Sequence, residues 1–347
     1  MKVLKSASID LTYKCNFRCK HCFNTSGEHT NRGCELTDEE ILKVIEDLKD
    51  IQVESVCLCG GEALLRKELL FECCRRLKEN GIRVSTVSNG YLLDRSIARG
   101  LKDAGIDVVQ VSIDGATEDT HDWMRNKEGS YKKAINALTV LRDEGVRTET
   151  AFVPTKRNIN ELDAAIDNAV NLGVEAFRIQ PIMNLGRAKK YLTEYFLDNN
   201  EYMFCKMVLD RKRKQYIHED FIIEWADPIE HLQFYSRLEN VLNYVGISAY
   251  GDILVTPYLS ISFGNIKRHS LKAYINAGLK RAWQNPVLKE IIENLHSTED
   301  MDVSKMGLPE IFVEENIDLD LISSDYKEKV EKVMQDWRRS LKQRGSG

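Results

Sequence analysis

The feature that most constrains the fold is a repeat of a short apolar run, a loop and a helical pattern across the first half of the chain. The apolar runs have the length of β-strands and lie at residues 7–11, 55–59, 84–88, 108–113, 148–153 and 176–181. The helical patterns between them end near glycines such as Gly105, Gly145 and Gly173, where a helix can leave through a left-handed residue. This repeat predicts an α/β fold with a parallel sheet and right-handed crossovers. Six strands suit either an open doubly wound sheet or a partial barrel.

The repeat stops near residue 190, and the pattern of the remaining chain is different. A charged helical stretch and a strand come first, followed by a hairpin pattern with a turn at Gly251 and Asp252 and by further helical segments. We therefore expect three parts. They are a βα domain at residues 1–190, a linking helix and strand at 191–230, and a hairpin with helices at 231–347.

Cysteine usage points to a reduced protein. Eight of the nine cysteines fall within the first 74 residues, and an odd, clustered count is a poor match to a disulfide framework. The sequence shows no signal peptide, and no apolar run approaches the length of a membrane helix. We expect a cytoplasmic protein with no membrane partner. The net charge of −5 also argues against a nucleic-acid partner, which would favour a basic surface.

Three of these cysteines form a compact group directly after the first predicted strand. Cys15, Cys19 and Cys22 are separated by three and then two residues. Soft thiolates in such a group favour iron–sulfur, zinc or copper(I) sites. Three thiolates on a four-iron cluster would leave one iron open, whereas electron carriers normally use four. A structural zinc site with Cys34 or His21 as the fourth ligand is the alternative.

A second motif, Gly60, Gly61 and Glu62, follows the second predicted strand. Two glycines there let the backbone approach a ligand closely. Together, the two motifs resemble those of radical S-adenosylmethionine (SAM) enzymes, which have Cys-x3-Cys-x2-Cys after the first strand and Gly-Gly-Glu after the second. The resemblance covers residues 5–190 well, although Ala63 stands where that family often has proline.

The resemblance implies a partial (β/α)6 TIM-type barrel. It also implies one [4Fe–4S] cluster held by Cys15, Cys19 and Cys22, and bound SAM whose reductive cleavage yields a 5′-deoxyadenosyl radical that abstracts hydrogen from a substrate C–H bond. The residues that would bind or flank SAM are, by the same resemblance, Gly60, Gly61 and Glu62 at the ammonium, Ser112 and Arg125 at the carboxylate, Ser88, Asn89 and Asp114 at the ribose or nearby polar groups, Gln180 and Leu185 near the adenine, and His21 and Phe23 beside the adenine or cluster.

The C-terminal third resembles the small α+β extension called SPASM or twitch, which often carries further clusters. No cysteine follows Cys205, so we expect a degenerate extension without an auxiliary cluster. Cys205, Asp227 and Tyr258 are candidate substrate residues. For Cys205 we favour the simpler interpretation of a small buried side chain. For Asp227 the structural alternative is a helix cap, and for Tyr258 it is packing on the barrel rim.

The resemblance predicts an enzyme that acts on a peptide, as in the maturation of ribosomally made peptides. The alternative is a small metabolite such as a sugar, nucleoside or tetrapyrrole, and an alternative of another class is a zinc-stabilised binding module without catalysis. An external electron donor such as flavodoxin or ferredoxin is expected. Because the first strand starts within ten residues, we expect no N-terminal peptide-recognition domain, which weakens the peptide interpretation, although a separate protein could supply the recognition. The sequence does not indicate which bond of the substrate is made or broken.

Overall fold

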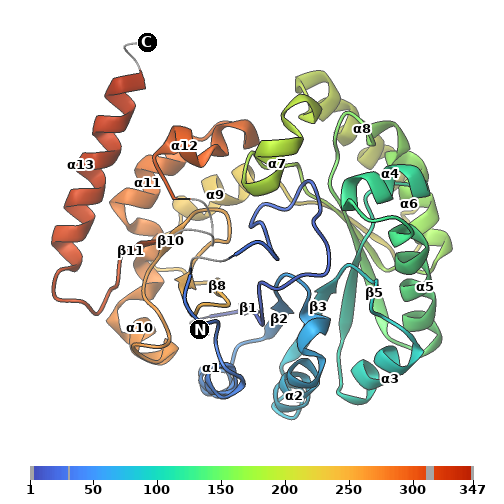
Figure 1. Cartoon of the computed structure of the whole chain (residues 1–347), viewed down its shortest axis with the longest axis horizontal. Helices are drawn as coiled ribbons and strands as arrows, with labels where there is room; N and C mark the ends of the chain where they lie inside the picture. The colour runs from blue at the N-terminus through green and yellow to red at the C-terminus, as the bar shows by residue number, and fades with distance from the viewer. Residues whose placement is uncertain (1–3, 30–31, 310–315, 345–347) are drawn as a thin grey trace.

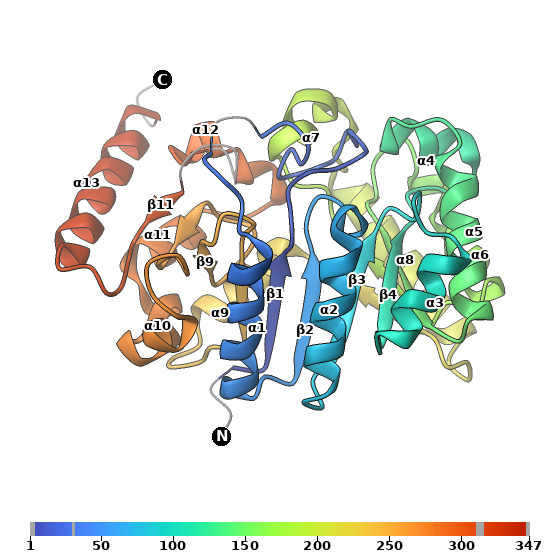
Figure 2. The ribbon, with the colours of Figure 1, turned by 60° about the horizontal axis from the view of Figure 1, so that its bottom comes forward.

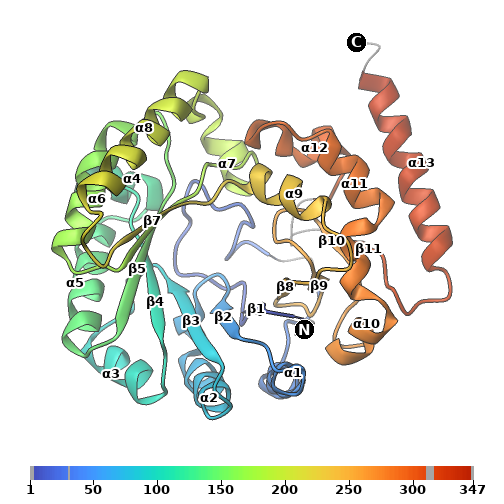
Figure 3. The ribbon, with the colours of Figure 1, turned by 180° about the vertical axis from the view of Figure 1, so that it is seen from behind.

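The computed structural model describes residues 4–29, 32–309 and 316–344. Its centre is a curved nine-stranded sheet in the order β7-β6-β5-β4-β3-β2-β1-β8-β9, in which every neighbouring pair is parallel except β8 and β9. The sheet wraps into an open barrel that Figure 1 views along its axis and Figure 3 shows from behind. The strands are β1 Ser6–Asp10, β2 Ser55–Cys59, β3 Arg83–Ser88, β4 Val108–Ser112, β5 Arg147–Phe152, β6 Ala176–Ile179, β7 Ile222–Trp225, β8 Tyr244–Ile247 and β9 Ile253–Leu254.

The parallel partial barrel predicted from the sequence is confirmed, and its six strands lie within one or two residues of the predicted bounds. The sheet is wider than expected, because β7 joins β6 and β8 joins β1. Both strands come from the chain after residue 190. Their sheet partners are distant in sequence, so no local pattern could reveal the pairing.

Helices cover the outer face of the sheet (Figure 2). Helix α1 (Asp38–Ile51) begins with the predicted capping box of Thr37 and Glu40 and buries an apolar stripe against the strands. The charged helical stretch expected after residue 190 is interrupted, because a second capping box at Asp198 and Glu201 starts a new helix there. The remaining helices of this layer are α2 Lys67–Lys78, α3 Arg95–Asp103, α4 Glu118–Arg125, α5 Ser130–Asp143, α6 Leu162–Asn171, α7 Gly186–Tyr191 and α8 Asn199–Gln215.

The C-terminal region packs beside the β1 edge of the barrel (Figure 2). Its β8–β9 hairpin is part of the main sheet, and a small parallel pair, β10 and β11, lies next to it. The described part of the chain holds no helix that is both long and apolar enough to cross a membrane. The elements of this region are α9 Pro228–Ser236, β10 Ile261–Ser262, α10 Leu271–Ala277, α11 Pro286–Glu293, α12 Val303–Met306, β11 Ile317–Asp318 and α13 Tyr326–Arg344.

Strand alternation gives the barrel two different faces. Side chains that point outward toward the helices are apolar and buried, as with Ile9 and Leu58. Side chains that point inward are mostly polar and only partly buried, as with Ser8, Cys57 and Arg178. A complete TIM barrel would fill its interior with branched apolar side chains. The polar interior of this open barrel therefore leaves room for ligands.

Candidate active site

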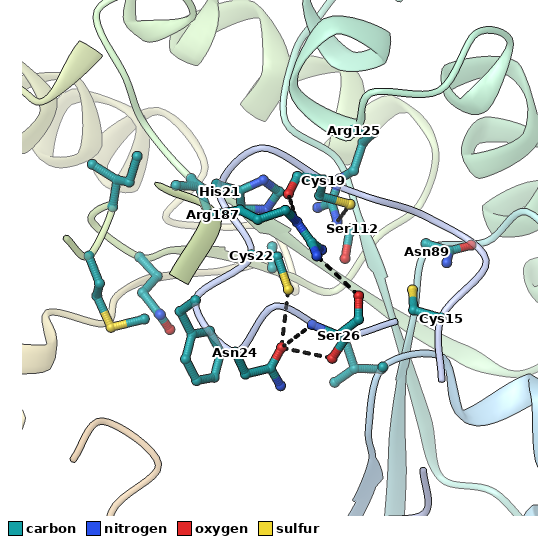
Figure 4. A pocket seen from close by; sticks show the side chains of 18 of the residues that line it. Cys15, Cys19, His21, Cys22, Asn24, Ser26, Asn89, Ser112, Arg125 and Arg187 are labelled. Carbon is teal, nitrogen blue, oxygen red and sulfur yellow. Dashed lines mark hydrogen bonds between the residues drawn. The ribbon is translucent and has the colours of Figure 1, made fainter. Parts of the chain in front are cut away.

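A cavity of about 240 Å³ opens at the carboxyl end of the strands, where parallel α/β folds place their sites. Figure 4 shows its walls. Most of the residues predicted from the sequence to bind the cluster or SAM line it: Cys15, Cys19, His21, Cys22, Phe23, Gly60, Gly61, Ser88, Asn89, Ser112, Arg125 and Gln180. Glu62, Asp114 and Leu185 are buried behind these walls.

The three cysteines surround the cavity without converging on one point (Figure 4). Within residues 4–29, 32–309 and 316–344, no three His, Cys, Asp or Glu side chains come close enough together to hold a single metal ion. Cys34 is exposed and lines a different pocket. A zinc ion needs four ligands around one centre, whereas each thiolate of a four-iron cluster binds a different iron. The arrangement therefore fits a cluster better than zinc.

Burial shifts the pKa values of two of the cysteines and of the histidine beside them. It raises the pKa of the Cys15 thiol to about 12 and also raises the pKa of Cys19, which the nearby Arg125 partly opposes. Burial lowers the pKa of His21 to about 4, so this imidazole is neutral at neutral pH. Because metal ligation requires thiolates, cluster binding at these positions releases protons.

The two glycines after β2 are required by close backbone packing. Gly61 donates its N–H to the carbonyl of Thr12 at 2.7 Å. A Cβ on Gly60 would lie 2.3 Å from the Thr12 carbonyl oxygen, and a Cβ on Gly61 would lie 2.4 Å from that of Lys14. Any larger side chain would push this loop away from the segment of Cys15 to Ser26, which we call the cysteine loop. The motif thus holds the cavity wall against the segment that carries the cysteines.

Glu62 braces this wall from behind. Its carboxylate accepts hydrogen bonds from the Ser88 hydroxyl and the Asn89 backbone N–H, both at 2.9 Å, and from the Leu64 N–H at 3.3 Å. It therefore ties the loop after β2 to the end of β3. Burial raises the pKa of Glu62, while the hydrogen bonds from Asn89 and Ser88 oppose this shift.

A buried ion pair lies under the cysteine loop. Arg125 Nε and Asp114 Oδ2 are 2.7 Å apart, and His21 Nε2 is 3.5 Å from the same oxygen. Burial would raise the pKa of Asp114, but the charge of Arg125 holds it below its usual value. The Arg125 guanidinium also reaches Cys19 Sγ at 3.8 Å. A positive charge so placed stabilises a thiolate and can meet an anionic group in the cavity.

Arg187 is the main site residue that we did not predict. Its Nε donates to the Cys19 carbonyl at 2.8 Å, and its Nη1 donates to the Ser26 carbonyl at 3.2 Å. Its backbone N–H also donates to the Cys22 carbonyl at 3.0 Å. One buried residue at the start of α7 thus fixes both ends of the segment from Cys19 to Ser26.

The three candidate substrate residues lie away from the cysteine cavity. Asp227 and Tyr258 both line a second cleft, of about 490 Å³, together with Arg178 and Glu224. Asp227 also caps α9 by accepting N–H groups of Ile229 and Glu230. Burial raises the pKa of Tyr258, and Arg178 opposes this shift. Cys205 is fully buried on α8, a helix that packs on α6 and β7 outside the barrel.

Comparisons with known proteins relate the chain to a family. The sequence model of the Radical SAM superfamily matches residues 9–169. A Fe-coproporphyrin III synthase from Methanosarcina barkeri is 29% identical over 210 residues, which cover 60% of this chain and 51% of that protein. A probable GTP 3′,8-cyclase from Saccharolobus islandicus is 30% identical over 238 residues, 67% of this chain and 76% of that protein. The chain thus spans only about half the length of the synthase.

Among solved structures, SuiB of Streptococcus suis bound to S-adenosylmethionine has a similar fold. It aligns with a TM-score of 0.63 and 14% identity, covering 84% of this chain and 68% of SuiB. SuiB has also been solved with its precursor peptide SuiA. The SuiB chain of that complex aligns with this chain with a TM-score of 0.58. At this identity, the likeness concerns the fold.

The buried ion pair generates a stability prediction. Replacing Asp114 with Asn leaves the buried Arg125 charge uncompensated, which should lower the free energy of unfolding by about 3 to 5 kcal/mol. The matched control is Asp119→Asn, which breaks the exposed pair with Arg157 and should cost less than about 1 kcal/mol. Urea unfolding of both variants at equal iron content measures the difference, and equal losses would contradict the prediction.

The Arg187 contacts generate a second prediction. Arg187→Ala leaves the carbonyls of Cys19 and Ser26 without their donors, so the cysteine loop should retain iron about tenfold less well. Arg187→Lys should recover only part of this loss, because an ammonium cannot reproduce the guanidinium geometry. Iron retained after gel filtration with a chelator is the measurement. Arg95→Ala, which removes surface pairs with Asp143 and Glu144, should retain iron like the wild type.

Proposed function

The chain belongs to the radical SAM superfamily, and from that premise we propose that its cysteine-lined cavity cleaves SAM reductively and directs the radical at a C–H bond of a peptide. Enzymes of this superfamily use a [4Fe–4S] cluster and SAM, and this chain is such an enzyme. Membership also disfavours the zinc-stabilised module without catalysis. The observation that carries the proposal is the grouping of the three cysteines, the two glycines and Arg125 around one cavity.

In this proposal Cys15, Cys19 and Cys22 hold the cluster. When bound and reduced, the cluster supplies one electron that breaks the S–C5′ bond of SAM and leaves a 5′-deoxyadenosyl radical. The protein's task is to hold the ligand loop still and to keep positive charge near it. Arg187 performs the first task through the Cys19 carbonyl, and Arg125 performs the second beside Cys19 Sγ.

The walls of the cavity supply groups that suit SAM. Gly60 and Gly61 present backbone at the cavity, and Glu62 holds that backbone in place, so we assign the methionine ammonium to this wall. Arg125 and Ser112, which line the same cavity, are suited to the carboxylate. The polar groups assigned to the ribose side are Ser88, Asn89 and, through Arg125, Asp114.

Apolar residues complete the cavity and limit water near the reacting carbon. Phe152, Val153, Ile182 and Met183 line it on the side of β5 and β6. A reactive radical must meet its target before it meets solvent or another hydrogen donor. Gln180 and the backbone that follows it, up to the start of α7 at Leu185, would face the adenine on this side.

A peptide substrate is supported by the fold likeness to SuiB, which extends over most of this chain and includes a structure with a precursor peptide. The wide second cleft at the barrel's open side gives an extended substrate a place to lie. Its lining residues Arg178, Asp227 and Tyr258 offer charge and hydrogen bonds. A separate protein would recognise the rest of the peptide, and an external electron carrier would reduce the cluster.

A small metabolite is the second candidate, and the named sequence relatives favour it. These relatives are named for a coproporphyrin and for GTP, and they are about twice as similar in sequence to this chain as SuiB is. A tetrapyrrole or a nucleotide would use Arg178 as an anion contact.

Removing any cluster ligand should abolish the chemistry. Cys15→Ala, Cys19→Ala and Cys22→Ala should each lose the cluster and form no 5′-deoxyadenosine above background, because the remaining thiolates cannot hold four irons. Chromatography of the reaction with SAM and a strong reductant measures the product. The matched control is Cys34→Ala, an exposed thiol outside the cavity, which should behave like the wild type. Sustained SAM cleavage by a ligand variant would refute the assignment.

The substrate class can be decided by stimulation of SAM cleavage. We expect a short peptide encoded beside this chain's gene to raise 5′-deoxyadenosine formation about tenfold or more over the rate without substrate, because substrate binding positions the target for the radical. Coproporphyrin III and GTP are the competing additions. Stimulation by one of these, together with none by the peptide, would replace the peptide proposal with the metabolite one.

A further inference from the structure

Four basic side chains gather on two aromatic rings beside the cysteine loop. Lys20 Nζ lies 4.0 Å from the centre of the Trp123 ring, and the Arg157 guanidinium lies 4.6 Å from the same ring. Lys127 Nζ and Lys133 Nζ lie 5.1 and 5.8 Å from the centre of the Tyr91 ring. We call this surface the cationic rim, defined by Lys20, Tyr91, Trp123, Lys127, Lys133 and Arg157.

The cationic rim is attached directly to the segment that carries the cysteines. Lys20 itself stands between Cys19 and Cys22, and its backbone N–H donates to the Met124 carbonyl at 2.9 Å. On the other side of the loop, Phe17 packs edge-on against Tyr91 with ring centres 5.4 Å apart. Figure 2 shows the cysteine loop and α4 at the same end of the barrel. A molecule seated on this rim would touch the cysteine loop.

The charge of the rim is poorly balanced by the protein. Arg157 forms an ion pair with Asp119 at 3.0 Å, and the neighbouring Glu118 forms an ion pair with Lys132 at 2.9 Å. In the portion of the chain that the structure describes, Lys20, Lys127 and Lys133 have no carboxylate at ion-pair distance. Two cations that share one ring repel each other, so this arrangement favours an external anion. The chain as a whole carries a net charge of −5, so four cations gathered at two rings differ from its average composition.

We propose that the cationic rim is the docking surface for an acidic one-electron carrier protein of the flavodoxin or ferredoxin type. The proposal rests on the proposed function, since it places the carrier beside the cluster ligands. Complementary charge speeds encounter and orients the partner, and the partly exposed Tyr91 and Trp123 rings and Arg157 are residue types enriched at interfaces. In each transfer the reduced carrier loses one electron and the protein gains one, with no bond made or broken.

Binding tests the surface independently of catalysis. Wild-type protein is titrated with oxidised flavodoxin by calorimetry at low and at high salt, beside the double variant Lys127→Glu and Lys133→Glu. We expect the double variant to bind about tenfold more weakly, and its salt dependence to be smaller, because like charges then face the acidic partner. The matched control reverses two exposed lysines of the C-terminal region, Lys280→Glu and Lys327→Glu. It changes the net charge equally and should bind like the wild type.

Electron transfer provides the second readout. With reduced flavodoxin, the double variant should gain its electron about tenfold more slowly than the wild type, followed as loss of visible absorbance of the cluster. With a small viologen radical, which needs no docking surface, the two proteins should differ by less than about twofold. Lys20→Gln, which removes a charge of the same rim without reversing it, should give an intermediate rate with flavodoxin.

The outcomes separate this proposal from the proposed function. If no cluster forms, or if the viologen-reduced protein does not cleave SAM, the proposed function fails. If viologen reduction and SAM cleavage proceed but flavodoxin binds and reduces the wild type, the double variant and the control equally, only the docking surface is refuted. A loss shared by the double variant and the control would also refute it, because net charge alone would then explain the effect.

Discussion

The structure depends on the fixation of a loop that has no regular secondary structure of its own. The segment from Cys15 to Ser26 cannot satisfy its backbone groups by a helix or a strand, yet much of it is buried. Several of its polar groups are satisfied by two later elements. Arg187 at α7 binds two of its carbonyls through the side chain, and Met124 in α4 accepts from Lys20. The parallel barrel matters because it brings these elements to one end of the sheet.

The fold was predictable from local signals, whereas the fixation of the loop was not. Strand-length apolar runs, the capping box at Thr37 and the helix-ending glycines each act within a few residues, and the structure confirms the elements they predict. The place of the cysteine motif and of the Gly-Gly-Glu motif at the cavity was also predictable, since each motif comes directly after a strand. Arg187 has no such signal. It contacts Cys19 across 168 positions of sequence, and only the curvature of the open barrel makes them neighbours.

The same distinction applies to side chains whose type was recognised but whose place was not. Glu62 at the SAM ammonium stays a prediction, and the structure adds the partners of its carboxylate, which are Ser88, Asn89 and Leu64 behind the wall. A sequence shows that a carboxylate follows two glycines, but the partner of that carboxylate lies on the next strand. Net charge has a similar limit. A total of −5 describes the whole surface and does not reveal four basic side chains collected at two rings.

In the proposed function, cofactor chemistry and substrate recognition draw on different parts of this sequence. The cysteine cavity is built from residues up to Arg187, whereas the second cleft draws on Glu224, Asp227 and Tyr258. Strand β6 connects them, because Arg178 within the strand lines the cleft and Gln180, directly after the strand, lines the cavity. The segment that matches the superfamily ends before this strand. A substrate bound at Arg178 could therefore place a carbon near the cavity while being selected by residues that the shared segment does not contain.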